Sequence, residues 1–414
     1  MSKPNYMEKL LEGVEVEWKA LGEIGEFTRG KRFVKTDMYK EGFPCIHYGE
    51  MYTHYNIWAE TTKSFVSFDL ASKLRVANHG DVVIVAAGET IEDIGIGTAW
   101  LGTTGVVIHD ACFSFRSSLN PKYVSYFLRT KQFHDQIKKH ISSGKISAIN
   151  ASGLGQAKIP IPPQKVQEEI VRILDSYTEL TTELTTELTT ELTARKSQYT
   201  YYRDKLLTFE EGEVEWKALG EIGSFVRGSG LQKSDFAESG VGCIHYGQIY
   251  TYYGNFAYQT KSFVSPTLAT KLRKAQKGDL IIATTSENIE DVCKPLVWFG
   301  EDEVCVSGET YIFKHNQNPK YIAYYLQTPM FFDYKKKSRT GTKVIRVHGE
   351  KLEKFEIPLP SLEDQNRIVS ILDKFDALTS SITEGLPREI ELRQKQYEYY
   401  RNILLSFPKS EVEA

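Results

Sequence analysis

The 414-residue chain contains two copies of one long pattern, separated by a constant 198 residues. The motif EVEWKALGEIG at residues 15–25 returns at 213–223, and CIHYG at residues 45–49 returns at 243–247. A period of this length lies well above that of solenoid repeats, which is roughly 20–50 residues. The pattern therefore predicts duplication of a whole domain, so that the chain folds as two similar halves.

The first part of each repeat, about 145 residues long, has the pattern of a mixed globular domain. Short apolar runs such as residues 81–85 and 279–282 alternate with glycine-containing turns, which is typical of strands. The pairs at 120–121 and 318–319 are both Asn-Pro. They indicate helix starts, because asparagine is a favoured N-cap and proline fits the first helical position.

The second part of each repeat predicts a long helix. No glycine or proline occurs between Pro163 and Gly212, and apolar residues recur there every three or four positions. Four copies of TELT occupy residues 178–193. Threonine is a poor helix former, so a leucine stripe on such a helix requires a packing partner. The equivalent segment of the second repeat supplies one, although Gly385 and Pro387 are expected to kink or interrupt it.

Together these patterns predict an α+β protein. Two similar globular domains are separated by two long antiparallel helices, which form a coiled coil with pseudo-twofold symmetry. The expected segments are an N-terminal stub and first domain at 1–158, a spacer helix at 159–212, a second domain at 213–356 and a second spacer helix at 357–414.

Composition and motifs exclude several classes of protein. No run approaches the ~20 apolar residues of a membrane span, and the N-terminus lacks the apolar core of a signal peptide. The five cysteines form no CxxC pair, which favours a reduced cytoplasmic protein without disulfides or structural zinc. The nearest approach to the NPPY motif of amino-methyltransferases, at residues 120–123, lacks its second proline.

Other catalytic readings fail as well. There is no P-loop for ATP. Asp81 with Glu89, or Asp279 with Glu287, could be imagined as metal ligands of a nuclease, but no Glu-x-Lys motif accompanies them. The sequence therefore contains no catalytic constellation and no metal site.

The binding chemistry lies in loops that recur in both repeats. Residues 15–160 carry 17 Lys and Arg against 15 Asp and Glu, and residues 213–358 carry 19 against 17, although the whole chain has a net charge of -3. Arginine and lysine reach phosphates or guanine edges, and glycine permits close approach of the backbone. The predicted DNA-contacting residues are Arg29, Lys31, Arg32, Tyr48, Tyr52, Lys138, Lys139, Lys145, Arg227, Ser229, Tyr246, Tyr250, Lys336, Arg339 and Lys343.

At this point the chain resembles a known family, the specificity (S) subunits of Type I restriction–modification enzymes. The resemblance covers nearly the whole chain and rests on the two globular segments, each followed by a long helix. It also rests on the IPIP and IPLP motifs at 159–162 and 357–360 and on the tyrosine-rich helix ends near 202 and 400. The tetrapeptide array resembles the type IC group, in which Thr-Ala-Glu-Leu is usual; here the repeat is Thr-Thr-Glu-Leu.

The resemblance implies a non-catalytic subunit with two target-recognition domains, each reading one half of a bipartite, asymmetric site in double-stranded DNA. It implies two methyltransferase (M) subunits and restriction/translocase (R) subunits as partners. S-adenosylmethionine, ATP and Mg are then expected on those partners and no cofactor on this chain. The residues expected to bind partners are Leu180, Leu184, Leu188, Leu192, Tyr202, Leu378, Ile382 and Tyr400.

Two alternatives remain open at the level of the sequence. One is a coiled-coil scaffold that presents two ligand-binding domains without recognising DNA. The other is a fused DNA methyltransferase or nuclease, which the missing cofactor motifs oppose. Basic loops at equivalent places in both repeats favour DNA recognition over the scaffold.

Overall fold

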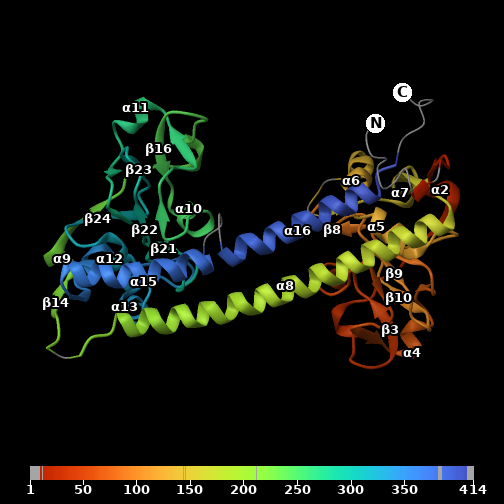
Figure 1. The fold of residues 1–414 in the computed structure, drawn as a ribbon, viewed down its shortest axis with the longest axis horizontal. Coiled ribbons are helices and arrows are strands. Elements are labelled where there is room, and N and C mark those ends of the chain that lie inside the picture. Colours follow the sequence, from red (N-terminus) through yellow and green to blue (C-terminus); the bar gives the residue numbers. More distant parts are fainter. Residues whose placement is uncertain are drawn as a thin grey trace. The chain divides into compact units, whose positions relative to one another are not determined.

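A computed structural model describes residues 10–11, 13–142, 144, 146–210, 212–380 and 385–407. The chain forms two compact units: unit 1 comprises Met1–Thr185 and Leu392–Ala414, and unit 2 comprises Thr186–Glu391. Each unit contains one globular domain together with parts of the long helices of both repeats (Figure 1). The units thus divide the chain differently from the four expected segments, because the helices are shared between them.

A five-stranded sheet forms the centre of the domain in unit 1, with strand order β2-β11-β7-β9-β4. Its strands are β2 (Gly25–Arg29), β4 (Trp58–Ala59), β7 (Val82–Val85), β9 (Gly97–Trp100) and β11 (Cys112–Ser117). Strand β7 is apolar throughout because both faces of the sheet are covered. Val82 and Ile84 pack in one hydrophobic cluster, and Val83 and Val85 pack in another.

A second, four-stranded sheet has the order β5-β3-β10-β6. Its strands are β3 (Phe43–Ile46), β5 (Ser64–Val66), β6 (Val76–Ala77) and β10 (Val106–Ile108). Two short antiparallel pairs complete the strands: β1 (Glu17–Ala20) with β13 (Lys158–Ile161), and β8 (Ala87–Gly88) with β12 (Ser147–Ala148). The short helices are α2 (Leu21–Ile24), η1 (Lys35–Asp37), α3 (Tyr48–Thr53), α4 (Phe68–Ala71), α5 (Pro121–Phe127), α6 (Lys131–Ile137), η2 (Lys138–His140) and α7 (Ala151–Gly155).

The domain in unit 2 repeats this architecture. Its five-stranded sheet, β15-β24-β20-β22-β17, consists of β15 (Gly223–Arg227), β17 (Phe256–Ala257), β20 (Leu280–Ala283), β22 (Lys294–Trp298) and β24 (Thr310–His315). The four-stranded sheet, β18-β16-β23-β19, consists of β16 (Val241–Ile244), β18 (Ser262–Val264), β19 (Lys274–Ala275) and β23 (Val304–Val306). The paired short strands are β14 (Glu215–Ala218) with β26 (Glu356–Leu359), and β21 (Thr285–Ser286) with β25 (Ile345–Arg346). The helices are α9 (Leu219–Ile222), η3 (Lys233–Asp235), α10 (Tyr246–Thr251), α11 (Pro266–Ala269), α12 (Pro319–Tyr325), α13 (Pro329–Ser338) and α14 (Gly349–Glu353).

The predicted capped helices attach each domain to its long helix. The Asn120 side chain accepts hydrogen bonds from the backbone N–H groups of residues 122 and 123, and Asn318 does the same for residues 320 and 321, which confirms both N-caps. In unit 1 Lys122 then forms an ion pair of 2.8 Å with Asp175 on α8 (Gln164–Leu206). In unit 2 Lys320 forms one of 2.6 Å with Asp373 on α15 (Leu362–Ser380).

A long helix follows each globular domain, as the sequence predicts. Helix α8 is continuous over 43 residues, whereas the second rod is divided into α15 and α16 (Gly385–Leu404). Gly385 has a φ of +78°, which a right-handed helix does not allow, so the expected interruption is confirmed. Within each unit the paired helices run in opposite directions (Figure 1).

Aromatic stacking holds each helix pair together. In unit 1 the rings of Tyr177 and Tyr400 stack with centroids 5.5 Å apart, and in unit 2 those of Tyr202 and Phe375 stack at the same centroid distance. The two pairs are equivalent under the 198-residue offset. The packing of the two predicted rods on each other is thereby confirmed within each unit.

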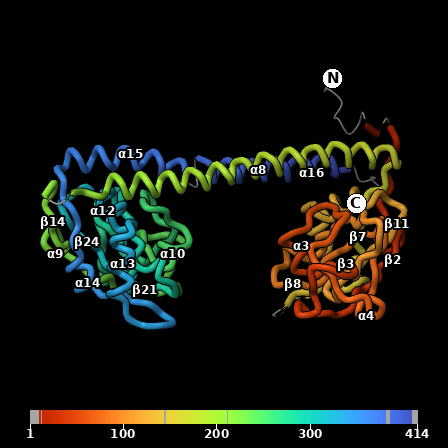
Figure 2. The backbone as a smooth tube through the Cα atoms, turned by 90° about the horizontal axis from the view of Figure 1, so that it is seen from below, coloured from red at the N-terminus to blue at the C-terminus, as the bar shows by residue number. Residues whose placement is uncertain are grey.

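Each core is completed by a chain segment from the other repeat. The end of α16 and the residues after it contribute Leu404, Leu405 and Phe407 to the core of unit 1, beside Leu11 of the N-terminal stub. The residue after α8, Leu207, enters the core of unit 2. In Figure 2 the domain of unit 2 lies on one side of α15 and the adjacent half of α8.

Candidate nucleic-acid interface

One groove opens in each domain beside the CIHYG motif. In unit 1 this groove, groove 1, has a volume of about 420 Å³ and is lined by segments 32–35, 47–48, 87–89 and 109–111 and by Ile146. Arginine, lysine, histidine, tyrosine and two carboxylates therefore converge on one small concavity. Such a mixture suits recognition of base edges, which present both donors and acceptors.

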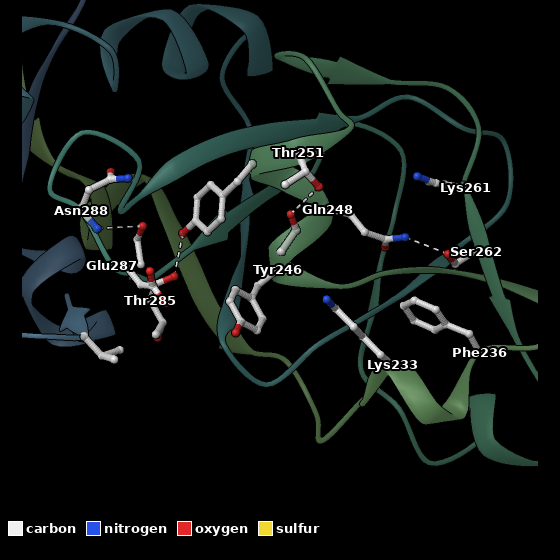
Figure 3. A pocket seen from close by; sticks show the side chains of 14 residues that line it. Lys233, Phe236, Tyr246, Gln248, Thr251, Lys261, Ser262, Thr285, Glu287 and Asn288 are labelled. Atoms are coloured by element: carbon white, nitrogen blue, oxygen red, sulfur yellow. Dashed lines mark hydrogen bonds between the residues drawn. The ribbon is translucent and has the colours of Figure 1, made fainter. Parts of the chain in front are cut away.

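Groove 2, in unit 2, has a volume of about 640 Å³. Its lining includes Lys233, Tyr246, residues 285–288 and Val344, and Figure 3 shows the labelled members. Lys233, Tyr246, Glu287 and Val344 are offset by 198 residues from Lys35, Tyr48, Glu89 and Ile146 of groove 1. The rest of the lining differs, because groove 2 adds Gln248 and Lys261, whereas groove 1 adds His109 and Asp110.

A histidine caps the helix that forms the floor of each groove. The Nδ1 atom of His47 accepts a hydrogen bond of 3.2 Å from the backbone N–H of Gly49, and His245 accepts the same bond from Gly247. In return the side chain of Glu50 accepts from the backbone N–H of His47. The two histidines thus cap the helices α3 and α10 and hold the following tyrosines, Tyr48 and Tyr246, which line the grooves.

The pKa of the capping histidines follows from this geometry. Burial, together with the nearby His109 and Lys35, lowers the pKa of His47 to about 4, and burial with Lys233 also lowers the pKa of His245. The fold therefore favours the neutral form of each imidazole. The resulting contribution to folding stability is fully present above the ordinary histidine pKa of about 6.5. It is lost as the pH falls from that value toward the folded pKa.

We expect acid to loosen groove 1 through His47. Asparagine caps helices without titrating, so His47→Asn should reduce the fall in thermal unfolding midpoint between pH 7.5 and 5.5. Replacing the exposed His54 with asparagine is the matched control and should leave the fall unchanged. Differential scanning calorimetry at several pH values measures it. Equal pH dependence in wild type and His47→Asn would contradict the assignment.

The structure places the predicted DNA-contacting residues in two groups around these grooves. The first comprises residues on the strand ends and floor. Arg32 and Tyr48 line groove 1, and Tyr246 and Tyr250 line groove 2. Tyr52 is half-buried and donates to the carbonyl of Ala87, next to groove 1.

The remaining residues of this first group bind backbone groups of other segments, and of those partners Asp110 lines groove 1. The Nε atoms of Arg29 and Arg227 donate to the carbonyls of Asp110 and Gly308, and Lys31 Nζ donates to the carbonyl of Lys73. The Ser229 hydroxyl accepts from the backbone N–H of Arg273. These contacts fix loop geometry and leave the other guanidinium nitrogens of both arginines, which are exposed, available to a ligand.

The second group lies on the helices and loops that precede β12 and β25. Lys138 and Lys139 in η2 are exposed, as are Lys336 in α13 and Arg339 and Lys343 in the loop that follows. Lys145 lies outside the described residues. The same loops bring Ile146 and Val344, which are 62% and 43% exposed, to the grooves.

The predicted partner-binding residues fall on the helix pairs. Leu180, Tyr202 and Tyr400 are exposed, whereas Leu378 and the remaining leucines of the stripe are half-buried. The half-buried members are Leu184, Leu188 and Leu192. Ile382 lies outside the described residues. The side chain of Leu180 on α8 is 51% exposed.

Sequence reasoning missed several groove residues as binding residues: Lys35, Glu89, Ile146 and their counterparts Lys233, Glu287 and Val344. The constant offset carried a signal for them, because each occupies the same place in both repeats. Among the described residues, no group of acidic, histidine and cysteine side chains could hold a metal ion. A search of the same residues finds no helix with the length and apolarity to cross a membrane.

The chain thus contains a duplicated domain with a groove in each copy, built around shared helices. The model of the family described as "Type I restriction modification DNA specificity domain" matches residues 13–194 and again residues 211–392. The chain therefore belongs to the Type I restriction–modification specificity subunits. Specificity subunits are the non-catalytic members of these systems, and they assemble with other subunits.

Two relatives are similar to this chain over almost its whole length. The chain is 35% identical to the Escherichia coli Type I restriction enzyme EcoR124I/EcoR124II specificity subunit, covering 99% of each chain. It is 33% identical to a putative type I restriction enzyme specificity subunit of Haemophilus influenzae, covering 97% of this chain and 98% of that one. A solved chain from a structure of type I R-M complex assembly has the same fold, with a TM-score of 0.63 over 95% of this chain and 98% of that one at 16% identity.

Proposed function

We propose that this chain reads a bipartite, asymmetric site in double-stranded DNA, with groove 1 and its basic loops on one half-site and groove 2 and its loops on the other. The observation that carries the proposal is the same groove built twice on one framework with different linings. Identical frameworks with unlike side chains suit two unlike target sequences. The exposed basic residues beside the grooves supply contacts to phosphates.

The proposal includes partners and a compartment. Two methyltransferase subunits and the restriction subunits dock on the helix pairs, where Leu180, Tyr202 and Tyr400 are exposed. These partners bring S-adenosylmethionine, ATP and Mg, and the complex acts in the cytoplasm. The net charge of -3 supports a division of labour, because a chain without bulk basicity gains phosphate contacts from its partners.

An exchange of one domain tests the proposal. Replacing residues 15–158 with the same segment of a relative should change one half-site of the methylated sequence and leave the other intact. The reason is that groove 1 is built wholly from this segment and groove 2 wholly from unit 2. Sequencing methylated bases in cells that carry the chimera with the methyltransferase subunits measures it.

The reciprocal exchange of residues 213–356 is the control and should change the other half-site only. If either chimera alters both half-sites, or neither, the two domains are not independent readers of DNA. The scaffold alternative predicts methylation at unchanged sequences in both chimeras.

A further inference from the structure

One glutamate lines each groove. Glu89 in groove 1 and Glu287 in groove 2 are exposed and lie 198 residues apart. Within the part of the chain that the structure describes, neither carboxylate makes a hydrogen bond or an ion pair. Both side chains are therefore available to a ligand that enters the groove.

The neighbouring aspartates are accounted for by local structure. Asp81 pairs with Arg116 through two contacts of 2.7 and 3.0 Å. Asp93 accepts from the Thr90 hydroxyl, and Asp291 accepts from the side-chain amide of Asn288 at 2.8 Å, so both close the turn that follows the groove segment. The carboxylates of Glu89 and Glu287 thus differ from these neighbours in having no hydrogen-bond or ion-pair partner among the described residues.

The segment that carries each glutamate differs between the repeats around that one residue. Residues 87–90 read Ala-Gly-Glu-Thr, and residues 285–288 read Thr-Ser-Glu-Asn. In both cases the two residues before the glutamate are fixed by strand pairing, β8 with β12 and β21 with β25. The backbone at the glutamate is therefore held in the same place in both grooves while its surroundings have changed.

A free carboxylate in a DNA-binding groove has an electrostatic cost, because DNA phosphates repel it. Lys35 and Lys233, which line the same grooves, offset part of that repulsion. A carboxylate gains in such a place by accepting a hydrogen bond from an exocyclic amino group, which only cytosine (N4) and adenine (N6) present in the major groove. Exposed Ile146 and Val344 also line these grooves and can exclude water from that bond.

We propose that Glu89 and Glu287 are specificity residues, each of which accepts a hydrogen bond from the amino group of one cytosine or adenine in its own half-site. The inference rests on the proposed function and adds that a carboxylate reads one base in each half-site, which is a cytosine or an adenine in either case. Neither the loop basic residues nor the tyrosines can make this distinction alone, since arginine and lysine only donate and tyrosine hydroxyl both donates and accepts.

Conservative substitutions test the assignment in the assembled complex. In cells with the methyltransferase subunits, Glu89→Gln should relax the methylated sequence at one position of the first half-site, because glutamine is of equal size but offers both a donor and an acceptor. Glu287→Gln should do the same in the second half-site only. Glu60→Gln, at an exposed position outside groove 1, is the charge-matched control and should leave the sequence unchanged.

A binding experiment tests whether the glutamate contacts the exocyclic amino group of one particular base. The purified complex is titrated with duplexes in which purine replaces each adenine, or 2-pyrimidinone each cytosine, one at a time. The wild-type complex should lose at least about tenfold in affinity, ~1.4 kcal/mol, at one position per half-site. The Glu89→Gln complex should lose less at the first of these positions, because a neutral amide oxygen is a weaker acceptor than a carboxylate.

The inference is overturned if Glu89→Gln leaves the methylated sequence unchanged. It is also overturned if the variant abolishes methylation altogether, since that outcome indicates a structural role. The domain exchange separates the two levels of the argument. If the exchange alters one half-site and Glu89→Gln alters none, the proposed function stands and only the role of the glutamates fails.

Discussion

Replacing Leu405 with alanine should destabilise the first domain, although this residue follows the last helix of the second repeat. Its side chain is 1% exposed and lies in the core of unit 1. Removing a buried leucine side chain leaves a cavity and costs about 2–5 kcal/mol. Hydrogen exchange followed by mass spectrometry should therefore show lost protection in residues 13–142 and retained protection in residues 212–356.

Leu207→Ala is the matched variant. Leu207 is also 1% exposed, lies 198 residues before Leu405, and follows a helix that begins in unit 1, but it packs in the core of unit 2. The loss of protection should then be confined to unit 2. Loss of protection in the same domain for both variants would contradict the exchange of helix ends between the repeats.

Deleting Thr182–Thr185 from α8 should shorten the gap between the two half-sites by one or two base pairs. One tetrapeptide of helix contributes about 6 Å and a rotation of about 40°, and a base pair rises ~3.4 Å. The half-site sequences should stay the same, because the deletion touches no groove residue. The fold should tolerate it, since the array repeats every four residues and the leucine stripe stays within about 40° of its place.

Removing only two residues, Thr185 and Thr186, should instead abolish methylation. Two residues fewer rotate the following part of α8 by about 160° from its present facing and turn the leucine stripe away from its partner. Methylome sequencing of cells that carry either deletion measures both results. An unchanged gap after the four-residue deletion would show that the array is a slack tether and not a spacer of defined length.

The sequence was sufficient to predict the duplication, the caps at Asn120 and Asn318, and the long helix with its interrupted counterpart. These features depend on local signals: N-cap chemistry, absence of glycine and proline, and a repeated period. The exchange of Leu207 and Leu405 between cores could not be predicted in detail, because it depends on contacts between residues about 200 positions apart. The identity of an apolar residue near a helix end does not indicate in which of the two hydrophobic cores it packs.

The grooves were predicted in part. The CIHYG motif led to Tyr48 and Tyr246, which do line them. Arg29 and Arg227 each donate a hydrogen bond to a backbone carbonyl 81 residues further along the chain. These bonds could not be predicted from the sequence, because a backbone acceptor has no sequence signature. Glu89 was considered beside Asp81 as a nuclease ligand, but Asp81 is buried and pairs with Arg116, whereas Glu89 is exposed.

The sharing of helix ends has a consequence for how such a chain can diverge. Two identical chains that swapped these helices would complete each other's cores and form a symmetric dimer. A dimer of that kind carries two copies of a single groove and is limited to palindromic targets. Joining the copies through the continuous helix α8 removes that limit, because a substitution in one groove is no longer copied into the other. The covalent link thus lets each groove change by itself, while each core still depends on a leucine supplied by the other repeat.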